Sequence, residues 1–404
     1  MLFRSSDKDN IQPRLGFAYD LRGDGRDVVR GGWGIYTDFG YINGNALNPG
    51  IDAAGGSGLV FSAVAPTGLR KADGTLFRAS DPLSSIAALN TVNPNLPPLS
   101  GFVLSPRLEQ PHTYQTNIGV AHQLDAASAV SVDYVAVDGR DLSMRFRPNQ
   151  LVNGQRFLAG IPIQPQGSAF RTAISKGESR YDGLTFDYRR RLSRGLDVNG
   201  WYTLSKSTSD IGSASDDLDQ NLVQDVRDPF GAVQNAPSMR TDARHRVTVS
   251  AIYEAPFAIN VSPIFSYRSA LPVHTFEGLD LNADGNVNDK TALAYKYTGL
   301  NDNGTATFKE DGNCETVNCS RRAPFSQMNL RVSRSFTLRG STRIEAIGEV
   351  FNLLNAANPF IPLTTRRLLN PTTPNAGFMQ PTQFAGDFQQ PEQRVGQVGF
   401  RLTF

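Results

Sequence analysis

Hydrophobic and polar residues alternate one by one along many segments of this chain. In the last segment the apolar positions are Val398, Phe400, Leu402 and Phe404, and the positions between them hold glutamine, glycine, arginine and threonine. Successive side chains of a β-strand point to opposite faces, so this spacing predicts a strand with one apolar face. The same period recurs along the chain, and no helical period competes with it over a useful length.

Eleven segments carry this pattern. The strands are predicted at residues 14–20, 28–37, 112–123, 128–147, 181–191, 196–207, 243–254, 259–268, 327–337, 341–351 and 394–404. The fourth is long, and a bend is expected at Gly139. Aromatic residues near strand ends, such as Trp201 and Tyr202, suit the aromatic girdle of a membrane barrel, although strands favour aromatic residues in any protein.

The connections between these strands are short and long in turn. The short ones are 21–27, 124–128, 192–196, 255–258 and 338–341, and the long ones are 38–111, 148–180, 208–242, 269–326 and 352–393. Alternation alone fits a soluble sandwich or a membrane barrel. Compact soluble domains rarely contain such long loops, whereas outer-membrane barrels have short turns at one end and long loops at the other. The sequence therefore predicts an all-β, antiparallel transmembrane β-barrel.

Composition supports this interpretation and excludes other classes. Among 404 residues, 40 are Lys or Arg and 38 are Asp or Glu, so charge gives no case for a nucleic-acid partner. No apolar run is long enough for a transmembrane helix. The first residues lack the apolar core of a signal peptide, so any export signal is expected outside this sequence. No sequence motif of a common enzyme class is present, and the four histidines show no metal-ligand spacing, so an enzyme is not expected.

Several stretches resemble one family. They include PRLGFAYDLRGDGRDVVRGGWGIYTD, YDGLTFDYRRRLSRGLDVNGWYTLSKS, DARHRVTVSAIYEAPF, NLRVSRSFTLRGSTRIEAIGEVFNLLNAANPF and the terminal GFRLTF. Together they resemble the C-terminal half of an Oar-like TonB-dependent receptor of the Gram-negative outer membrane. The resemblance implies a 22-stranded barrel, of which residues 1–404 supply about eleven strands, and a plug domain that has no counterpart here. The chain is accordingly interpreted as a barrel fragment or a truncated gene product.

The resemblance also implies function and partners. Substrate would bind at the extracellular loops and pass through the barrel, with energy from the TonB system acting on the plug. A surface adhesion or structural protein, or a non-functional fragment, is the alternative, and a soluble secreted β-protein is a third hypothesis. The apolar face that ends at Phe404 resembles the signal read by the barrel assembly machinery. Membrane lipid and an extracellular ligand complete the expected partners.

The sharpest local motif is GLDLNADGNVNDK. It places oxygen ligands at alternate positions, as a calcium loop does: Asp280, Asn282, Asp284, Asn286 and Asn288. Position twelve of such a loop is Thr291, where an EF-hand carries glutamate, and a polar turn of Asp, Asn and Gly would read the same way. The motif predicts structural Ca²⁺, and no other cofactor is expected. A second acidic cluster, Asp216, Asp217 and Asp219, lies in the loop before it.

The chain has two cysteines, Cys314 and Cys319, close together in a polar stretch. An even, local pair is typical of a disulfide in an oxidising compartment, with two unrelated reduced cysteines as the alternative.

Overall fold

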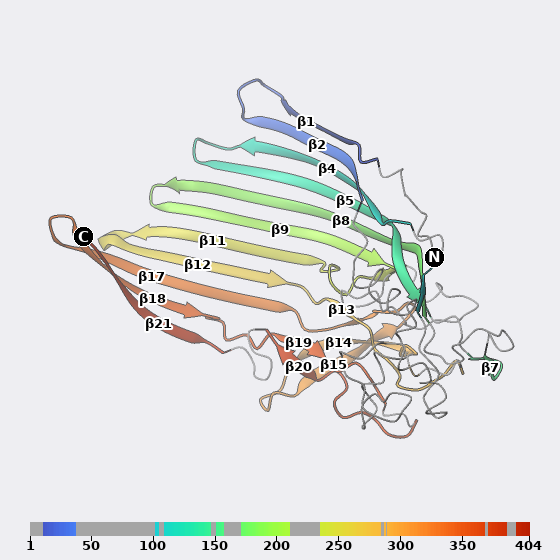
Figure 1. Cartoon of the computed structure of the whole chain (residues 1–404). Coiled ribbons are helices and arrows are strands. Elements are labelled where there is room, and N and C mark those ends of the chain that lie inside the picture. The colour runs from blue at the N-terminus through green and yellow to red at the C-terminus, as the bar shows by residue number, and fades with distance from the viewer. Residues whose placement is uncertain are drawn as a thin grey trace, which may run out of the picture.

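The computed structural model describes residues 11–37, 102–104, 109–146, 151–156, 171–210, 235–283, 287, 289–367, 371–385 and 393–404 (Figure 1). Strands make up nearly all of its regular structure. Among the described residues they are interrupted by one 3-10 turn, η4 (Pro256–Ala258). Within these ranges no helix is long and apolar enough to cross a membrane.

Eleven strands lie side by side in chain order, each antiparallel to the next (Figure 1). They are β1 (Arg14–Asp20), β2 (Asp27–Thr37), β4 (His112–Gln123), β5 (Ser128–Phe146), β8 (Arg171–Ser193), β9 (Leu196–Ser209), β11 (His245–Ala255), β12 (Ile259–Arg268), β17 (Phe325–Arg339), β18 (Thr342–Phe351) and β21 (Val395–Thr403). Two short strands at the margin, β3 (Phe102–Leu104) and β10 (Ala236–Pro237), pair with β8 and β9. The eleven predicted strands and their antiparallel order are confirmed.

One strand is longer than its pattern predicts. β8 begins at Arg171, ten residues before the predicted start, because its pairing with β5 continues beyond a register shift between Gly139 and Leu142. Pairing resumes there and reaches Phe146 opposite Thr172. The bend expected at Gly139 is therefore a bulge, and the two strands extend past it as one ribbon.

The five short connections are tight turns at one end of the sheet (Figure 1). Only Arg194 and Gly195 join β8 to β9, and both have positive φ, 54° and 75°. That conformation matches the right-handed twist of a hairpin. After β4, the Asp125 carboxylate accepts hydrogen bonds from the backbone N–H groups of Ala127 and Ser128, at 2.7 Å each. Local hydrogen bonding thus shapes the turns, and the neighbouring hairpin adds to it where the Glu254 N–H donates to the Gly195 carbonyl at 2.7 Å.

The sheet has one apolar and one polar face. The register between strands pairs apolar residues with apolar ones, so each face continues from strand to strand. One apolar row runs through Val398, Gly348, Val332, Val261 and Tyr253, which are successive partners on β21, β18, β17, β12 and β11. These apolar side chains are not covered: Val398 is 81% exposed and Tyr253 is 46% exposed. The sheet has no second layer on this face in the part of the chain that the structure describes, so its apolar side chains require a non-aqueous environment.

The polar face carries ion pairs within and between strands. Arg30 donates hydrogen bonds to the Asp133 carboxylate at 2.8 and 3.1 Å. Arg331 lies 3.4 Å from Glu345, and Arg189 lies 2.9 Å from Asp187. These side chains are partly exposed, so each pair adds little stability, but together they make the face hydrophilic.

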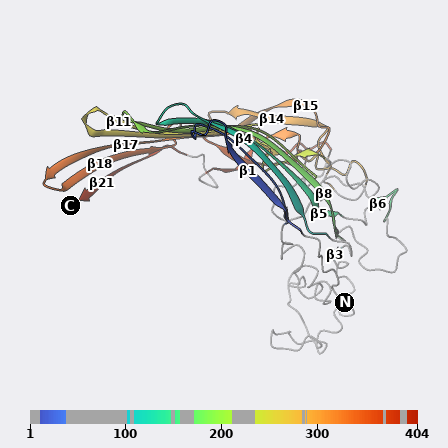
Figure 2. The ribbon, with the colours of Figure 1, turned by 90° about the horizontal axis from the view of Figure 1, so that it is seen from above.

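The sheet is curved and open (Figure 2). β1 and β21 are its two edges, and among the described residues they do not pair with each other. At the end opposite the turns, the described strands between residues 269 and 324 form a second, smaller sheet (Figure 1). Its order is β13 (Pro272–Val273), β16 (Ser320–Arg321), β14 (Leu293–Leu300) and β15 (Ala306–Asn313).

Two further strand pairs lie in the connections: β19 (Pro359–Pro362) with β20 (Pro381–Phe384), and β6 (Leu151–Val152) with β7 (Gln155–Arg156). The β13–β16 sheet packs on the segment around β20 through a small core in which Tyr295, Phe378 and Met379 are almost fully buried. The rings of Tyr295 and Phe378 meet edge to face, with centroids 4.9 Å apart. The strand segments of the connections at 269–324 and 352–394 thus form one packed unit, called the loop assembly below.

Candidate functional site

The loop assembly is held together by a buried acidic residue. Glu277 is 7% exposed, and its Oε1 accepts hydrogen bonds from Arg366 Nη1 at 2.8 Å and from Arg367 Nε at 2.6 Å. A backbone hydrogen bond joins the same two segments, because the Phe276 N–H donates to the Thr364 carbonyl at 2.9 Å. A buried carboxylate with two guanidinium partners ties the two loops together.

A third connection joins this assembly. Asp242, which precedes β11, is 3% exposed and lies 2.8 Å from Arg321 on β16. Its other oxygen accepts a hydrogen bond from the Ser207 N–H on β9 at 3.0 Å. The Asn318 amide donates to the Pro237 carbonyl at 3.1 Å. Through these contacts the loop assembly is fixed to the end of the large sheet.

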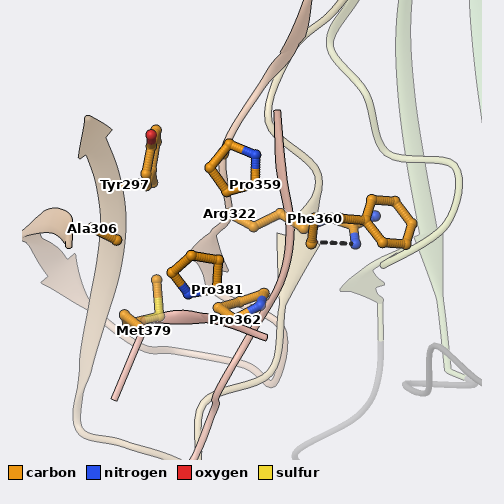
Figure 3. Close-up of a pocket in the computed structure, with 9 residues that line it drawn as sticks. Tyr297, Ala306, Arg322, Pro359, Phe360, Pro362, Met379 and Pro381 are labelled. Atoms are coloured by element: carbon orange, nitrogen blue, oxygen red, sulfur yellow. Dashed lines mark hydrogen bonds between the residues drawn. The ribbon is translucent and has the colours of Figure 1, made fainter. Parts of the chain in front are cut away.

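An apolar gap lies where the loop assembly meets the start of β17. Figure 3 shows its lining residues, among them three prolines, Phe360 and Arg322. Its free volume is about 10 Å³, about enough for one water molecule. Arg322 Nη1 donates to the Phe360 carbonyl at 3.1 Å, and its guanidinium lies 4.8 Å from the ring centre. The gap is therefore a packing defect with a stacked arginine and is too small for an organic ligand.

The two cysteines lie at the edge of the loop assembly. Their sulfur atoms are bonded, and their Cα atoms are 5.4 Å apart. Both cysteines lie in the short connection between β15 and β16. The disulfide therefore closes a loop whose two ends are already fixed by these strands. The bridge is local and the sequence contains no other cysteine, which fits a structural role.

The predicted calcium loop lies only partly within the described residues. Asp280 and Asn282 are exposed, whereas Asp284, Asn286 and Asn288 lie outside the described residues. Asp289 is buried and its Oδ2 accepts the Leu281 N–H at 2.7 Å, so it closes the loop from within. Among the described residues, no three acidic, histidine or cysteine side chains gather as a metal site would require. Structural Ca²⁺ stays a prediction. Asp216, Asp217 and Asp219 lie outside the described residues.

The predicted terminal signal lies on the exposed edge strand. Val398, Phe400, Leu402 and Phe404 are 57–91% exposed and share the apolar face of β21. Recognition by the barrel assembly machinery stays a prediction.

The prediction for Trp201 is wrong. The register pairs Trp201 with Asp187 on β8 and Thr248 on β11, which places the ring on the polar face and in the middle of β9, away from an interfacial girdle. It is 43% exposed. In the sequence, Trp201 alternates together with Asp197 and Asn199, which places all three on the polar face. This alternation predicts the position of Trp201 correctly, whereas the tendency of aromatic residues to lie at strand ends does not.

Sequence reasoning missed a concavity on the polar face near the loop end. It has a volume of about 440 Å³ and is lined by aromatic, hydroxyl and arginine side chains from β8, β9, β11, β12 and β17. A neighbouring concavity of about 370 Å³ contains the paired residues Arg30, Asp133, Asp187 and Arg189. Trp201 lies on the boundary of both. These sites form where side chains from several strands meet, and that depends on the register between the strands. A period-two pattern within one strand does not predict which residues of the next strand lie opposite.

Comparison with known proteins defines the class of this one. The model of the outer membrane beta barrel domain family matches residues 2–397. The chain belongs to this family, and its location is the outer membrane of Gram-negative bacteria. Its apolar face therefore faces lipid, and its polar face faces the lumen. Short turns are periplasmic in such barrels, so the loop assembly lies outside the cell.

Several solved outer-membrane proteins are similar to this chain. The outer membrane transporter YddB from Escherichia coli is 9% identical, with a TM-score of 0.51, and the match covers 97% of this chain and 40% of YddB. The pyoverdine outer membrane receptor FpvA from Pseudomonas aeruginosa PAO1 matches at 10% identity and a TM-score of 0.46, covering 97% of this chain and 36% of FpvA.

The FrpB iron transporter from Neisseria meningitidis matches at 10% identity and a TM-score of 0.44, covering 97% of this chain and 39% of FrpB. The chain spans less than half the length of these proteins. A search of curated proteins gave no match. At this level of identity the likeness to YddB shows the fold alone.

Proposed function

We propose that this chain is the C-terminal barrel portion of an Oar-like TonB-dependent receptor, which binds a ligand at its outside loops and passes it through the lumen. The observation that carries the proposal is the combination of a packed loop assembly at the mouth of the sheet with a hydrophilic inner face. A solute that leaves the loops would meet arginines, carboxylates and hydroxyls along the sheet. Lipid excludes such groups, so this face is suited to a polar passage.

Energy for passage would come from the TonB system acting on a plug domain, which the resembled family carries ahead of its barrel. In this proposal the described sheet is the passive wall, and it has no catalytic chemistry.

A surface adhesin is the second candidate. Exposed apolar side chains on the loops favour it, among them Leu281 at 63% and Leu363 at 38% exposure. An adhesin would use these side chains to hold a partner at the cell surface, and nothing would cross the barrel.

The test is uptake by Gram-negative cells that express the gene from which this chain derives. The probes are radiolabelled siderophores, oligosaccharides and peptides, measured with and without an uncoupler that collapses the proton-motive force. Transport predicts that one class accumulates inside the cells and that the uncoupler abolishes its accumulation. Binding that stays at the surface and does not respond to the uncoupler would overturn transport and support adhesion.

A further inference from the structure

Two arginines on the polar face lie opposite each other without an acidic partner. Arg246 on β11 and Arg268 on β12 are direct cross-strand neighbours, so their side chains share one face. Like charges directly opposite on a sheet are unfavourable. Elsewhere on this face Arg30, Arg189 and Arg331 each pair with a carboxylate. Among the described residues, neither Arg246 nor Arg268 forms an ion pair.

Their remaining contacts leave hydrogen-bonding capacity unused. Arg246 Nη2 donates to the Thr241 carbonyl at the long distance of 3.4 Å. The Arg268 guanidinium lies 5.9 Å from the centre of the Phe325 ring, and its Nε is buried without a hydrogen-bond partner. A guanidinium has five N–H donors in a fork that matches an oxyanion. The two side chains thus present unsatisfied donors to the same space.

That space is the concavity of about 440 Å³ described above. It is an open hollow on the face of the sheet. Its lining includes the hydroxyls of Thr203, Thr248 and Ser266, the rings of Tyr181 and Trp201, and no aspartate or glutamate. Gly183 leaves room for the Tyr181 ring, because a Cβ there would lie 2.6 Å from the tyrosine hydroxyl.

The positive charge extends to the loop end. Burial, and to a lesser degree the charge of Arg268, lower the pKa of Arg322 to about 10. Arg322, in the connection that leads into β17, therefore stays protonated at neutral pH and adds a third positive charge. Lipid head groups face the other side of the sheet, so they are not candidates to neutralise this charge.

We propose that this concavity is a binding site for a small aromatic anion, with its carboxylate or phosphate held by Arg246 and Arg268 and its ring against Trp201. The proposal rests on the transport function and deepens it by naming the charge and ring character of the cargo. Direct binding to the purified chain of residues 1–404 tests it independently of uptake, so failure of one leaves the other standing.

The experiment uses Trp201 as its own reporter. The chain has two tryptophans, and Trp33 lies on the apolar face opposite Leu15, so Trp33→Phe leaves Trp201 as the sole tryptophan, which is excited apart from the tyrosines at the long-wavelength edge of its absorption. The variant is refolded in detergent micelles and titrated with benzoate, neutral benzamide and cationic benzylamine. We expect saturable quenching by benzoate alone, with affinity that falls as salt is raised.

Arginine substitutions then locate the site. Arg246→Gln and Arg268→Gln should each weaken benzoate binding by about ten-fold or more, because a charge-assisted hydrogen bond is lost. Arg268→Lys keeps the positive charge but lacks the forked guanidinium, so its benzoate affinity should lie between those of the wild type and Arg268→Gln. Arg189→Gln is the matched control, since that arginine is already paired with Asp187 on the same face, and it should leave binding unchanged.

Three results would overturn the proposal. The first is quenching by benzamide or benzylamine as strong as that by benzoate. The second is wild-type benzoate affinity in both glutamine variants, and the third is benzoate affinity that does not change with salt. Circular dichroism of each variant checks that it has folded, and the salt titration of the Trp33→Phe protein needs no arginine variant at all. Binding that does not change with salt would contradict the electrostatic basis of the site.

Discussion

At the scale of single residues, close backbone approaches decide which positions tolerate a side chain. Gly278 has a φ of +78°, and a Cβ there would lie 2.2 Å from the Arg367 carbonyl oxygen. Gly304 has nearly the same φ, +80°, but nothing lies within 4 Å of its Cβ position. The two glycines therefore separate the cost of the conformation from the cost of a collision.

We expect Gly278→Ala to destabilise the loop assembly more than Gly304→Ala, by roughly 1–3 kcal/mol. Both variants share the strain of a positive φ, and only the first forces Arg367 and its neighbours to move. Limited proteolysis of the loops, with cleavage rates at several temperatures, measures the difference. Equal cleavage rates in the two variants would show that the loops shift freely at Gly278.

Some features of single residues can be predicted from the sequence, and others cannot. The phase of Trp201 could be predicted, because alternation alone places it among polar neighbours. The opposition of Arg246 and Arg268 could not, because it depends on the register between two strands. Oxygen ligands at alternate positions predict calcium in the loop that contains Asp280. The spacing does not reveal that Asp289 Oδ2 accepts a hydrogen bond from the Leu281 N–H in the same loop.

At the scale of elements, the strands of the large sheet follow from two local signals. Each membrane strand must bury apolar side chains in lipid and polar ones in the lumen, so the period of two is enforced along its whole length. Each hairpin turn closes with its own residues, as Arg194 and Gly195 do. The strands of the loop assembly lack both signals. β13 and β16 have two residues each and pair across almost fifty positions of chain.

The two faces should respond differently to charge. Val249 and Ser250 are neighbours in the middle of β11, paired with Phe265 and Ile264 respectively, so they point to lipid and to lumen. Val249→Arg should cost about 2–4 kcal/mol near the bilayer midplane, whereas Ser250→Arg should cost little. Urea unfolding of the protein in lipid vesicles gives both values. Similar losses for the two variants would mean that the faces are assigned wrongly.

At the scale of the whole molecule, the curved sheet and the loop assembly are separate layers joined at few points. Glu277 holds two loops together, and Asp242 joins the assembly to the sheet. Because these ties lie at one end, the loops can loosen without a change in the strands below them.

Glu277→Gln should therefore act on the loops alone. Removal of the charge leaves Arg366 and Arg367 without their carboxylate, and since both are partly exposed we expect a cost of about 2 kcal/mol, less than for a fully buried pair. Protease should cut the loops faster while the β-sheet circular dichroism stays constant. Glu310→Gln on β15, an exposed position, serves as the control. Loss of sheet signal in the Glu277 variant would show that the two layers unfold together.

The ties within the loop assembly have a consequence for the entropy of binding. Glu277 with its arginines, Asp242 with Arg321 and the ring contacts around Tyr295 are all made by the chain itself. The loops thus lose their conformational freedom when the protein folds, and a ligand that docks on them has less disorder to remove. Such a surface gains affinity through preorganisation and gives up the ability to wrap around ligands of different shapes.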